Sequence, residues 1–76
     1  MDIREVFARN LRLTRREKGF SQESLALEAD VDRTYISALE RGVYAASIDM
    51  VEKLAVVLGV DASALLQRPP RPSRNK

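Results

Sequence analysis

A short helical pattern, DRTYISALERG at residues 32–42, places small and hydrogen-bonding side chains opposite its apolar residues Ile36 and Leu39. The residues on the polar face are Arg33, Thr34, Ser37 and Ala38. An arginine can donate two hydrogen bonds to guanine O6 and N7, and short side chains let the end of a helix enter the major groove. Ala38 is small enough to let the helix sit deep or to touch a thymine methyl. The chemistry that this pattern favours is therefore contact with base edges.

Simpler interpretations exist for several of these side chains. Arg33 can instead be an exposed first-turn arginine that pairs with Asp30 or Asp32. Ser37 is also common on solvated helix faces, and Tyr35 either touches DNA or packs as a half-buried aromatic ring beside the preceding turn. The pattern alone leaves these alternatives open.

The elements that must position this face are helices, because the apolar residues recur with helical periodicity and no strand pattern is present. Capping residues and glycines divide the chain into five expected helices, at residues 3–18, 22–29, 33–41, 48–58 and 62–67. The links between them are short, so neighbouring helices should pack together in an all-α domain at residues 1–67. Residues 68–76, RPPRPSRNK, contain three prolines and four cations and are predicted to be a disordered basic tail.

The second and third helices should form a helix-turn-helix at residues 21–42. Ser21 and Asp32 are the expected N-caps, and Asp30 should adopt the left-handed conformation where the chain turns. Val31 is apolar within this turn, so we expect it to fill the space between the two helices.

The fourth and fifth helices should complete the core. Ser47 and Asp61 are their expected N-caps, and Gly59 should follow the end of the fourth. The core stripe expected on the fourth helix is Ile48, Val51, Leu54, Ala55 and Leu58. Apolar residues beside this stripe or near the C-terminal end form either a dimer interface or peripheral core, and these are Met50, Val57 and Leu66.

Composition excludes several classes of function. The 76 residues contain no Cys and no His, which removes disulfides, the usual metal ligands and the usual catalytic bases, so we expect neither a metal nor a cofactor. No apolar run approaches the roughly 20 residues of a membrane span. Residues 1–20 carry six basic and three acidic side chains, whereas residues 21–67 carry three basic and eight acidic ones. The net charge of +2 is therefore a weak indicator of a nucleic-acid partner.

The order of these residues resembles the Cro/C1-type (XRE-type) helix-turn-helix family over residues 4–66. The similarity is carried by LRLTRREKGF, by SQESLALEADVDRTYISALERG and by SIDMVEKLAVVLGVDASALL. It implies a compact five-helix, lambda-repressor-like domain that binds double-stranded operator DNA, usually as a homodimer. The segment DRTYISALERG particularly resembles the small controller proteins of restriction–modification systems, although phage repressors, antitoxins and orphan regulators share this architecture.

The resemblance also implies roles for individual residues. Arg33, Thr34 and Ser37, with Ala38 and Tyr35, would face bases. Residues that would contact phosphates are Ser21, Gln22, Arg41 and, in a loop that lacks the family's usual basic residues, Tyr44. Arg15 and Glu40 would form an internal ion pair that ties the first helix to the recognition helix.

These implications predict a sequence-specific transcriptional regulator, either a repressor or an activator, that binds a partly palindromic operator. No small-molecule effector is expected, and the location should be the cytoplasm of a bacterium or the host cell of a phage, at the nucleoid. An antitoxin-like protein-interaction module with secondary DNA binding is the alternative. An enzyme is not expected, because the chain offers neither a paired-carboxylate cleft nor a glycine-rich phosphate loop.

Overall fold

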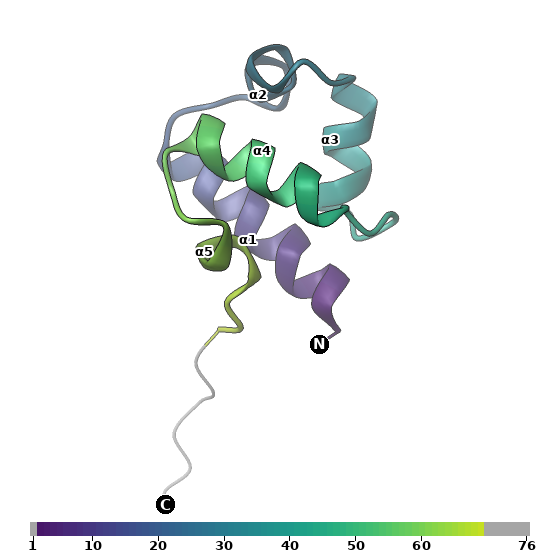
Figure 1. The fold of residues 1–76 in the computed structure, drawn as a ribbon. Coiled ribbons are helices and arrows are strands. Elements are labelled where there is room, and N and C mark those ends of the chain that lie inside the picture. Colours follow the sequence, from purple (N-terminus) through teal and green to yellow (C-terminus); the bar gives the residue numbers. More distant parts are fainter. Residues whose placement is uncertain (1, 70–76) are drawn as a thin grey trace, which may run out of the picture.

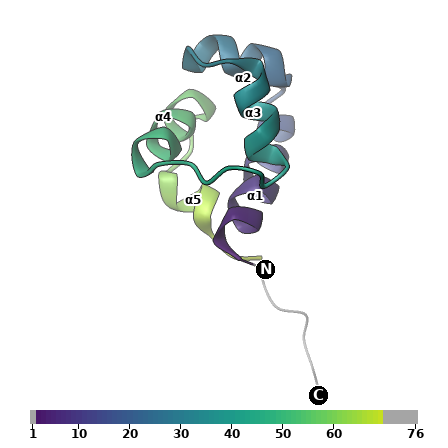
Figure 2. The same cartoon turned by 90° about the vertical axis from the view of Figure 1, so that its right-hand side faces the viewer.

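The five helices of the computed structural model, which describes residues 2–69, pack around one apolar core (Figure 1). They are α1 (Ile3–Glu17), α2 (Gln22–Ala29), α3 (Arg33–Glu40), α4 (Ile48–Leu58) and α5 (Ala62–Leu66). Helix α1 packs against α3 and α5, while α2 contacts α3 and α4, and α4 contacts α5. Figures 1 and 2 both place α2 at one end of the molecule, with the start of α1 at the other. The predicted all-α, five-helix architecture is confirmed.

Side-chain caps set where most helices begin. The hydroxyl of Ser21 accepts from the backbone N–H of Ser24, and the hydroxyl of Ser47 accepts from that of Met50. Helix α1 begins with a reciprocal pair that the sequence analysis missed, because Asp2 and Glu5 each accept the other's backbone N–H at 3.0 Å. These bonds satisfy donors that a helix start otherwise leaves unpaired.

The last helix departs from its prediction. Helix α5 ends at Leu66 rather than residue 67, and Asp61 occupies its N-cap position without a side-chain capping bond. Of the tail predicted at residues 68–76, the structure describes only residues 68 and 69, so most of that prediction lies outside the described residues.

The core is made of aliphatic side chains and one aromatic ring. Seven large side chains are fully buried, and they are Val6, Leu11, Leu25, Ile36, Leu39, Leu54 and Leu65. Each stabilises the fold by about 1.5–3 kcal/mol through burial. Ile48 was expected in this core, and that prediction is wrong because its side chain is 86% exposed. It is the first residue of α4, and its side chain lines an apolar groove at the surface rather than the core.

A buried amide joins the first and last helices. Asn10, which is 8% exposed, donates through Nδ2 to the carbonyl of Leu65 at 3.0 Å and to that of Gln67 at 2.7 Å. These carbonyls belong to the end of α5, where no further helical turn supplies donors. Asn10 therefore acts as a side-chain cap for a helix more than fifty residues away in the sequence.

Removing this cap should weaken the fold. We expect Asn10→Ala to lower the free energy of unfolding by about 1–3 kcal/mol, because one buried and one partly buried carbonyl would lose their donor. Urea denaturation followed by circular dichroism measures the change. Arg4→Ala, at an exposed position on the same helix, should change stability by less than about 0.5 kcal/mol. An equal loss in both variants would contradict the capping role.

No helix within residues 2–69 is both long and apolar enough to cross a membrane.

Candidate nucleic-acid interface

The turn between α2 and α3 fixes the direction of α3. Asp30 takes the left-handed conformation with φ 58° and ψ 47°, as predicted. The N–H of Val31 donates to the carbonyl of Ala26 at 2.9 Å, and the Val31 side chain packs against the core. Asp32 then caps α3 by accepting from the Thr34 N–H at 3.4 Å. The predicted helix-turn-helix is confirmed, with both caps and the left-handed turn at the expected residues.

The outward face of α3 presents polar side chains at its start. Arg33 and Thr34 are exposed and Ser37 is half-buried, whereas Ile36 and Leu39 are fully buried on the opposite side. The helix therefore turns Arg33 and Thr34 toward solvent, and its apolar face holds it to the domain.

Tyr35 is half-buried and packs against the core, which fits the packing alternative of the sequence analysis. Its ring lies 6.3 Å from the ring of Tyr44, centroid to centroid, with the planes tilted by 31°. This aromatic contact joins α3 to the loop at residues 43–47, where Tyr44 is 55% exposed.

Ala38 does not project from the exposed face. The structure leaves it only 5% exposed, so the outward position expected for it is wrong. Helix α1 packs against α3, and the chain beyond Gly42 turns back until the Val43 N–H donates to the Ala38 carbonyl at 3.0 Å. Gly42 permits this reversal because its φ is +72°, a conformation that side chains disfavour.

A buried ion pair joins α1 to the end of α3, as predicted. Arg15 donates to both oxygens of Glu40, through Nε to Oε2 at 2.5 Å and through Nη2 to Oε1 at 3.0 Å. The side chains are 9% and 3% exposed, respectively. The third arginine nitrogen, Nη1, donates to the Phe20 carbonyl at 2.9 Å and thereby also holds the link between α1 and α2.

The residues predicted to contact phosphates lie at two places. Ser21 and Gln22 stand at the start of α2, where the Ser21 hydroxyl acts as the cap and the Gln22 amide nitrogen donates to Glu40 Oε1 at 3.1 Å. Arg41 and Tyr44 are exposed beyond the end of α3, and Arg41 Nε donates to the Ser37 carbonyl at 3.3 Å. The Gln22 contact with Glu40 had no counterpart in the sequence analysis.

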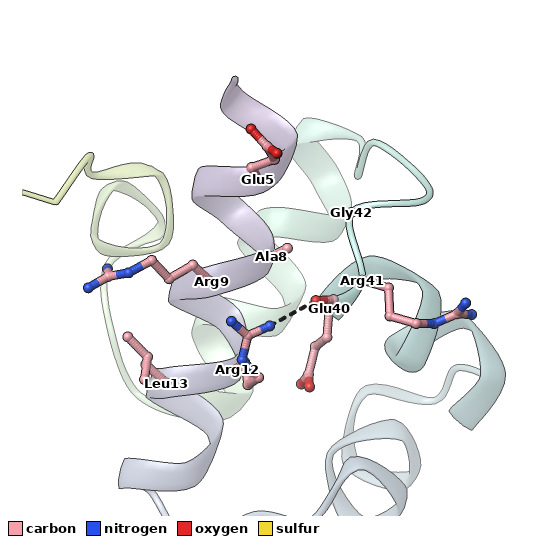
Figure 3. Close-up of a pocket in the computed structure, with 8 residues that line it drawn as sticks. All are labelled: Glu5, Ala8, Arg9, Arg12, Leu13, Glu40, Arg41 and Gly42. Atoms are coloured by element: carbon pink, nitrogen blue, oxygen red, sulfur yellow. Dashed lines mark hydrogen bonds between the residues drawn. The ribbon is translucent and has the colours of Figure 1, made fainter. Parts of the chain in front are cut away.

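A hollow of about 400 Å³ lies between α1 and the end of α3 (Figure 3). Three arginines line it, but Figure 3 shows Arg9 and Arg41 pointing away from each other. Arg12 instead donates to the Glu40 carbonyl at 3.0 Å and so caps the end of α3 from α1. The three guanidinium groups do not converge on one point, so this hollow is not built as an anion site.

A second surface feature is an apolar groove of about 260 Å³ between the start of α1, the start of α4 and α5. Its lining residues are Ile3, Ala46, Ile48, Val51, Glu52, Ala62 and Leu66. Of the three residues suggested for a dimer interface, Leu66 lines this groove and is 39% exposed, while Met50 and Val57 pack partly against the core. Ile3 and Ile48, at 50% and 86% exposed, were not assigned to this surface from the sequence.

Comparison with known proteins supports this geometry. A hypothetical transcription factor from Neisseria meningitidis serogroup B is 48% identical over 68 residues, which cover 90% of this chain and 64% of that protein. The chain thus spans slightly less than two thirds of that relative. The crystal structure of a hypothetical transcription factor, NHTF, from Neisseria is 48% identical and superposes with a TM-score of 0.86, covering 90% of this chain and 78% of the other.

Two further proteins extend the similarity. The control protein C.BamHI of Bacillus amyloliquefaciens is 46% identical over 66 residues, covering 86% of this chain and 82% of that protein. The crystal structure of SinR, a master regulator for biofilm formation, in complex with DNA is 35% identical with a TM-score of 0.76, and the match covers 80% of this chain and 98% of the other. SinR also occurs among the relatives from Bacillus subtilis.

The helix-turn-helix family model HTH_3 matches residues 11–65, which include the whole of the turn, the recognition helix and the buried ion pair. The relatives and the solved structure named above carry the names of transcription factors and control proteins, not of enzymes. The chain therefore belongs to the HTH_3 family, the Cro/C1-type helix-turn-helix DNA-binding family that its sequence resembles.

Proposed function

We propose that this protein is a sequence-specific transcription regulator that binds a partly palindromic operator as a homodimer. The observation that carries the proposal is the face of α3: Arg33 and Thr34 are solvent-exposed, Ser37 is half-buried beside them, and the helix is fixed at its far end through Glu40. A rigid helix with an exposed polar start is what direct recognition in the major groove requires.

In this arrangement Arg33, Thr34 and Ser37 contact base edges, and phosphate contacts come from the two ends of the helix-turn-helix. Gln22 and the start of α2 hold one phosphate, because the positive end of a helix favours an anion. Arg41 and the Tyr44 hydroxyl hold the backbone beyond the end of α3. Ala38 is left out of the base-contacting set because it is buried.

The homodimer is assigned to the apolar groove. A surface that exposes Ile48 and Ile3 to water is unfavourable in isolation, and a twofold-related copy offers the same apolar residues in return. Of the residues expected at the interface from the sequence, only Leu66 lines this groove. The proposed interface therefore contains Ile3 and Ile48 instead of Met50 and Val57. Two recognition helices would then enter successive major grooves about 34 Å apart.

Control of restriction–modification genes is the biological role that we favour within the family. The support is the sequence identity to the control protein C.BamHI, because the match covers 82% of the length of C.BamHI. The place of action would be the nucleoid in the cytoplasm, where operator DNA lies.

Selection of bound duplexes from a random DNA library at about physiological salt tests the proposal. We expect enrichment of a palindrome whose half-sites are centred about one helical turn apart. Weak and strongly salt-dependent binding without enrichment would contradict sequence-specific recognition. That result would instead favour a protein-interaction module with secondary DNA binding.

Arg33→Ala tests the assignment of the base-reading face on the selected operator. We expect it to remove discrimination at one base pair in each half-site, a loss of about 1–3 kcal/mol per contact. Competition binding with operators changed at single positions measures this loss. Arg41→Ala should weaken binding to all duplexes by the same factor, because a phosphate contact does not depend on sequence. Unchanged discrimination in the Arg33 variant would overturn the assignment.

A further inference from the structure

We propose that Glu40 is a positioning residue for DNA binding: it holds the Gln22 amide in the orientation in which Gln22 contacts a phosphate. This inference rests on the proposed function. It gives the buried Glu40 carboxylate a role in DNA binding in addition to its ion pair with Arg15. The observation behind it is the hydrogen bond from Gln22 Nε2 to Glu40 Oε1 at 3.1 Å, between residues of two different helices.

Glu40 is itself held rigidly. Its two oxygens accept two hydrogen bonds from the planar guanidinium of Arg15, and its side chain is only 3% exposed. A bidentate arginine–carboxylate pair fixes the carboxylate plane as well as its position. The oxygen that accepts from Gln22 also accepts from Arg15 Nη2 at 3.0 Å, so the Gln22 contact is made to an atom that is already immobilised.

The chemistry of the acceptor sets the direction of the amide. An ionised carboxylate accepts hydrogen bonds and donates none, so Gln22 must turn its nitrogen, not its oxygen, toward Glu40. That nitrogen carries a second hydrogen. Beside it, the backbone N–H groups of Gln22 and Glu23 open α2 and have no carbonyl within the helix to which they can donate. The start of α2 therefore offers several donors to a phosphate oxygen.

Holding Gln22 in advance affects the strength of DNA binding. A glutamine side chain has three rotatable torsions, and ordering it during binding reduces affinity. Because Glu40 already orders the Gln22 side chain in the free protein, the entropy of ordering that side chain is not lost when DNA binds. Glu40 also lies in the last turn of α3, so the same carboxylate connects the phosphate contact of α2 with the recognition helix.

A double-mutant cycle separates positioning from a purely structural role. The background variant carries Arg15→Met together with Glu40→Met, since apolar replacement of a whole buried ion pair is often neutral or stabilising. Gln22→Ala is then introduced into the wild-type chain and into this background. Dissociation constants are measured by fluorescence anisotropy on the selected operator and on an unrelated duplex, after circular dichroism has shown that each variant is folded.

We expect Gln22→Ala to weaken binding about tenfold per subunit in the wild-type chain, on both duplexes, since a hydrogen bond to a phosphate is lost. The paired methionine background should itself bind about tenfold more weakly, and Gln22→Ala should then change its affinity by less than about twofold. Glu23→Gln is the matched control, because this exposed neighbour makes no bond to Glu40 and should have the same effect in both backgrounds.

Two results would overturn the inference. One is an equal loss from Gln22→Ala in both backgrounds, and the other is a paired methionine variant that binds as tightly as wild type. Failure of this inference can be distinguished from failure of the proposed function. If no operator is selected, sequence-specific recognition is refuted. The double-mutant cycle on the unrelated duplex still measures the phosphate contact in that case.

Nuclear magnetic resonance of the wild-type chain gives a second measurement should the methionine variant fail to fold. The side-chain amide of Gln22 should show an order parameter near that of rigid backbone, about 0.85. A value below about 0.6 would describe a freely rotating side chain and would overturn the inference.

Discussion

Arg15→Ala should lower the free energy of unfolding by about 3–5 kcal/mol, among the largest stability effects that we expect from a single substitution in this chain. The variant leaves the Glu40 carboxylate buried, at 3% exposure, without its cation. It also removes the donor to the Phe20 carbonyl, which lies between α1 and α2. A loss of this size is a large fraction of the stability of a small domain, so the variant should be substantially unfolded at physiological temperature.

Urea denaturation measures this loss, and Arg16→Ala provides the matched control. Arg16 is adjacent in α1 but exposed, so its removal should change stability by less than about 0.5 kcal/mol. If Arg15→Ala lowered the free energy of unfolding by less than about 1 kcal/mol, the ion pair would not behave as a buried one. A loss of that size is typical of ion pairs on the surface.

Ile48→Asp should abolish dimerisation while leaving the monomer folded. The side chain is 86% exposed, so the monomer core does not depend on it. In the proposed dimer each copy buries this isoleucine, which stabilises the complex by about 1.5–3 kcal/mol per side chain. A carboxylate in its place would be buried without a partner, and the twofold symmetry would repeat the effect. We expect the dimer dissociation constant to rise by at least about 100-fold.

Sedimentation velocity over a range of concentrations measures the dimer, and Val56→Asp is the control for an added charge. Val56 lies on the same helix and is 68% exposed, but it does not line the groove. It should therefore leave the dimer unchanged. A dimer that survives Ile48→Asp but dissociates in the Val56 variant would move the interface to another face of α4.

Local features of this fold could be predicted from the sequence because their causes are local. The Ser21, Asp32 and Ser47 caps, and the left-handed Asp30, depend on hydrogen bonds and torsions within a few residues, and all four are confirmed. The Arg15–Glu40 pair is also confirmed, although helical periodicity alone does not specify a contact across twenty-five residues. Its prediction came from the family resemblance.

Features that depend on the arrangement of whole helices could not be predicted in this way. Ile48 continues the apolar stripe of α4 but extends past the core, and periodicity does not show where the covering helices end. Ala38 falls on the outward side of α3 by helical angle, yet the reversal after Gly42 and the packing of α1 enclose it. Asn10 looks like an ordinary polar residue until α5 is placed beside it.

Because helix α5 is short, it is a candidate for independent local opening despite its anchoring by Asn10. Five residues are too few for a helix to persist in water without packing. Its attachment includes the buried Leu65 side chain and two carbonyl contacts with Asn10. Opening α5 alone would expose less apolar surface than unfolding the whole domain, so it would cost less free energy. Since α5 contributes Ala62 and Leu66 to the apolar groove, an opened helix would remove part of that surface. The proposed subunit association and the closing of α5 would then be thermodynamically linked, each favouring the other by mass action.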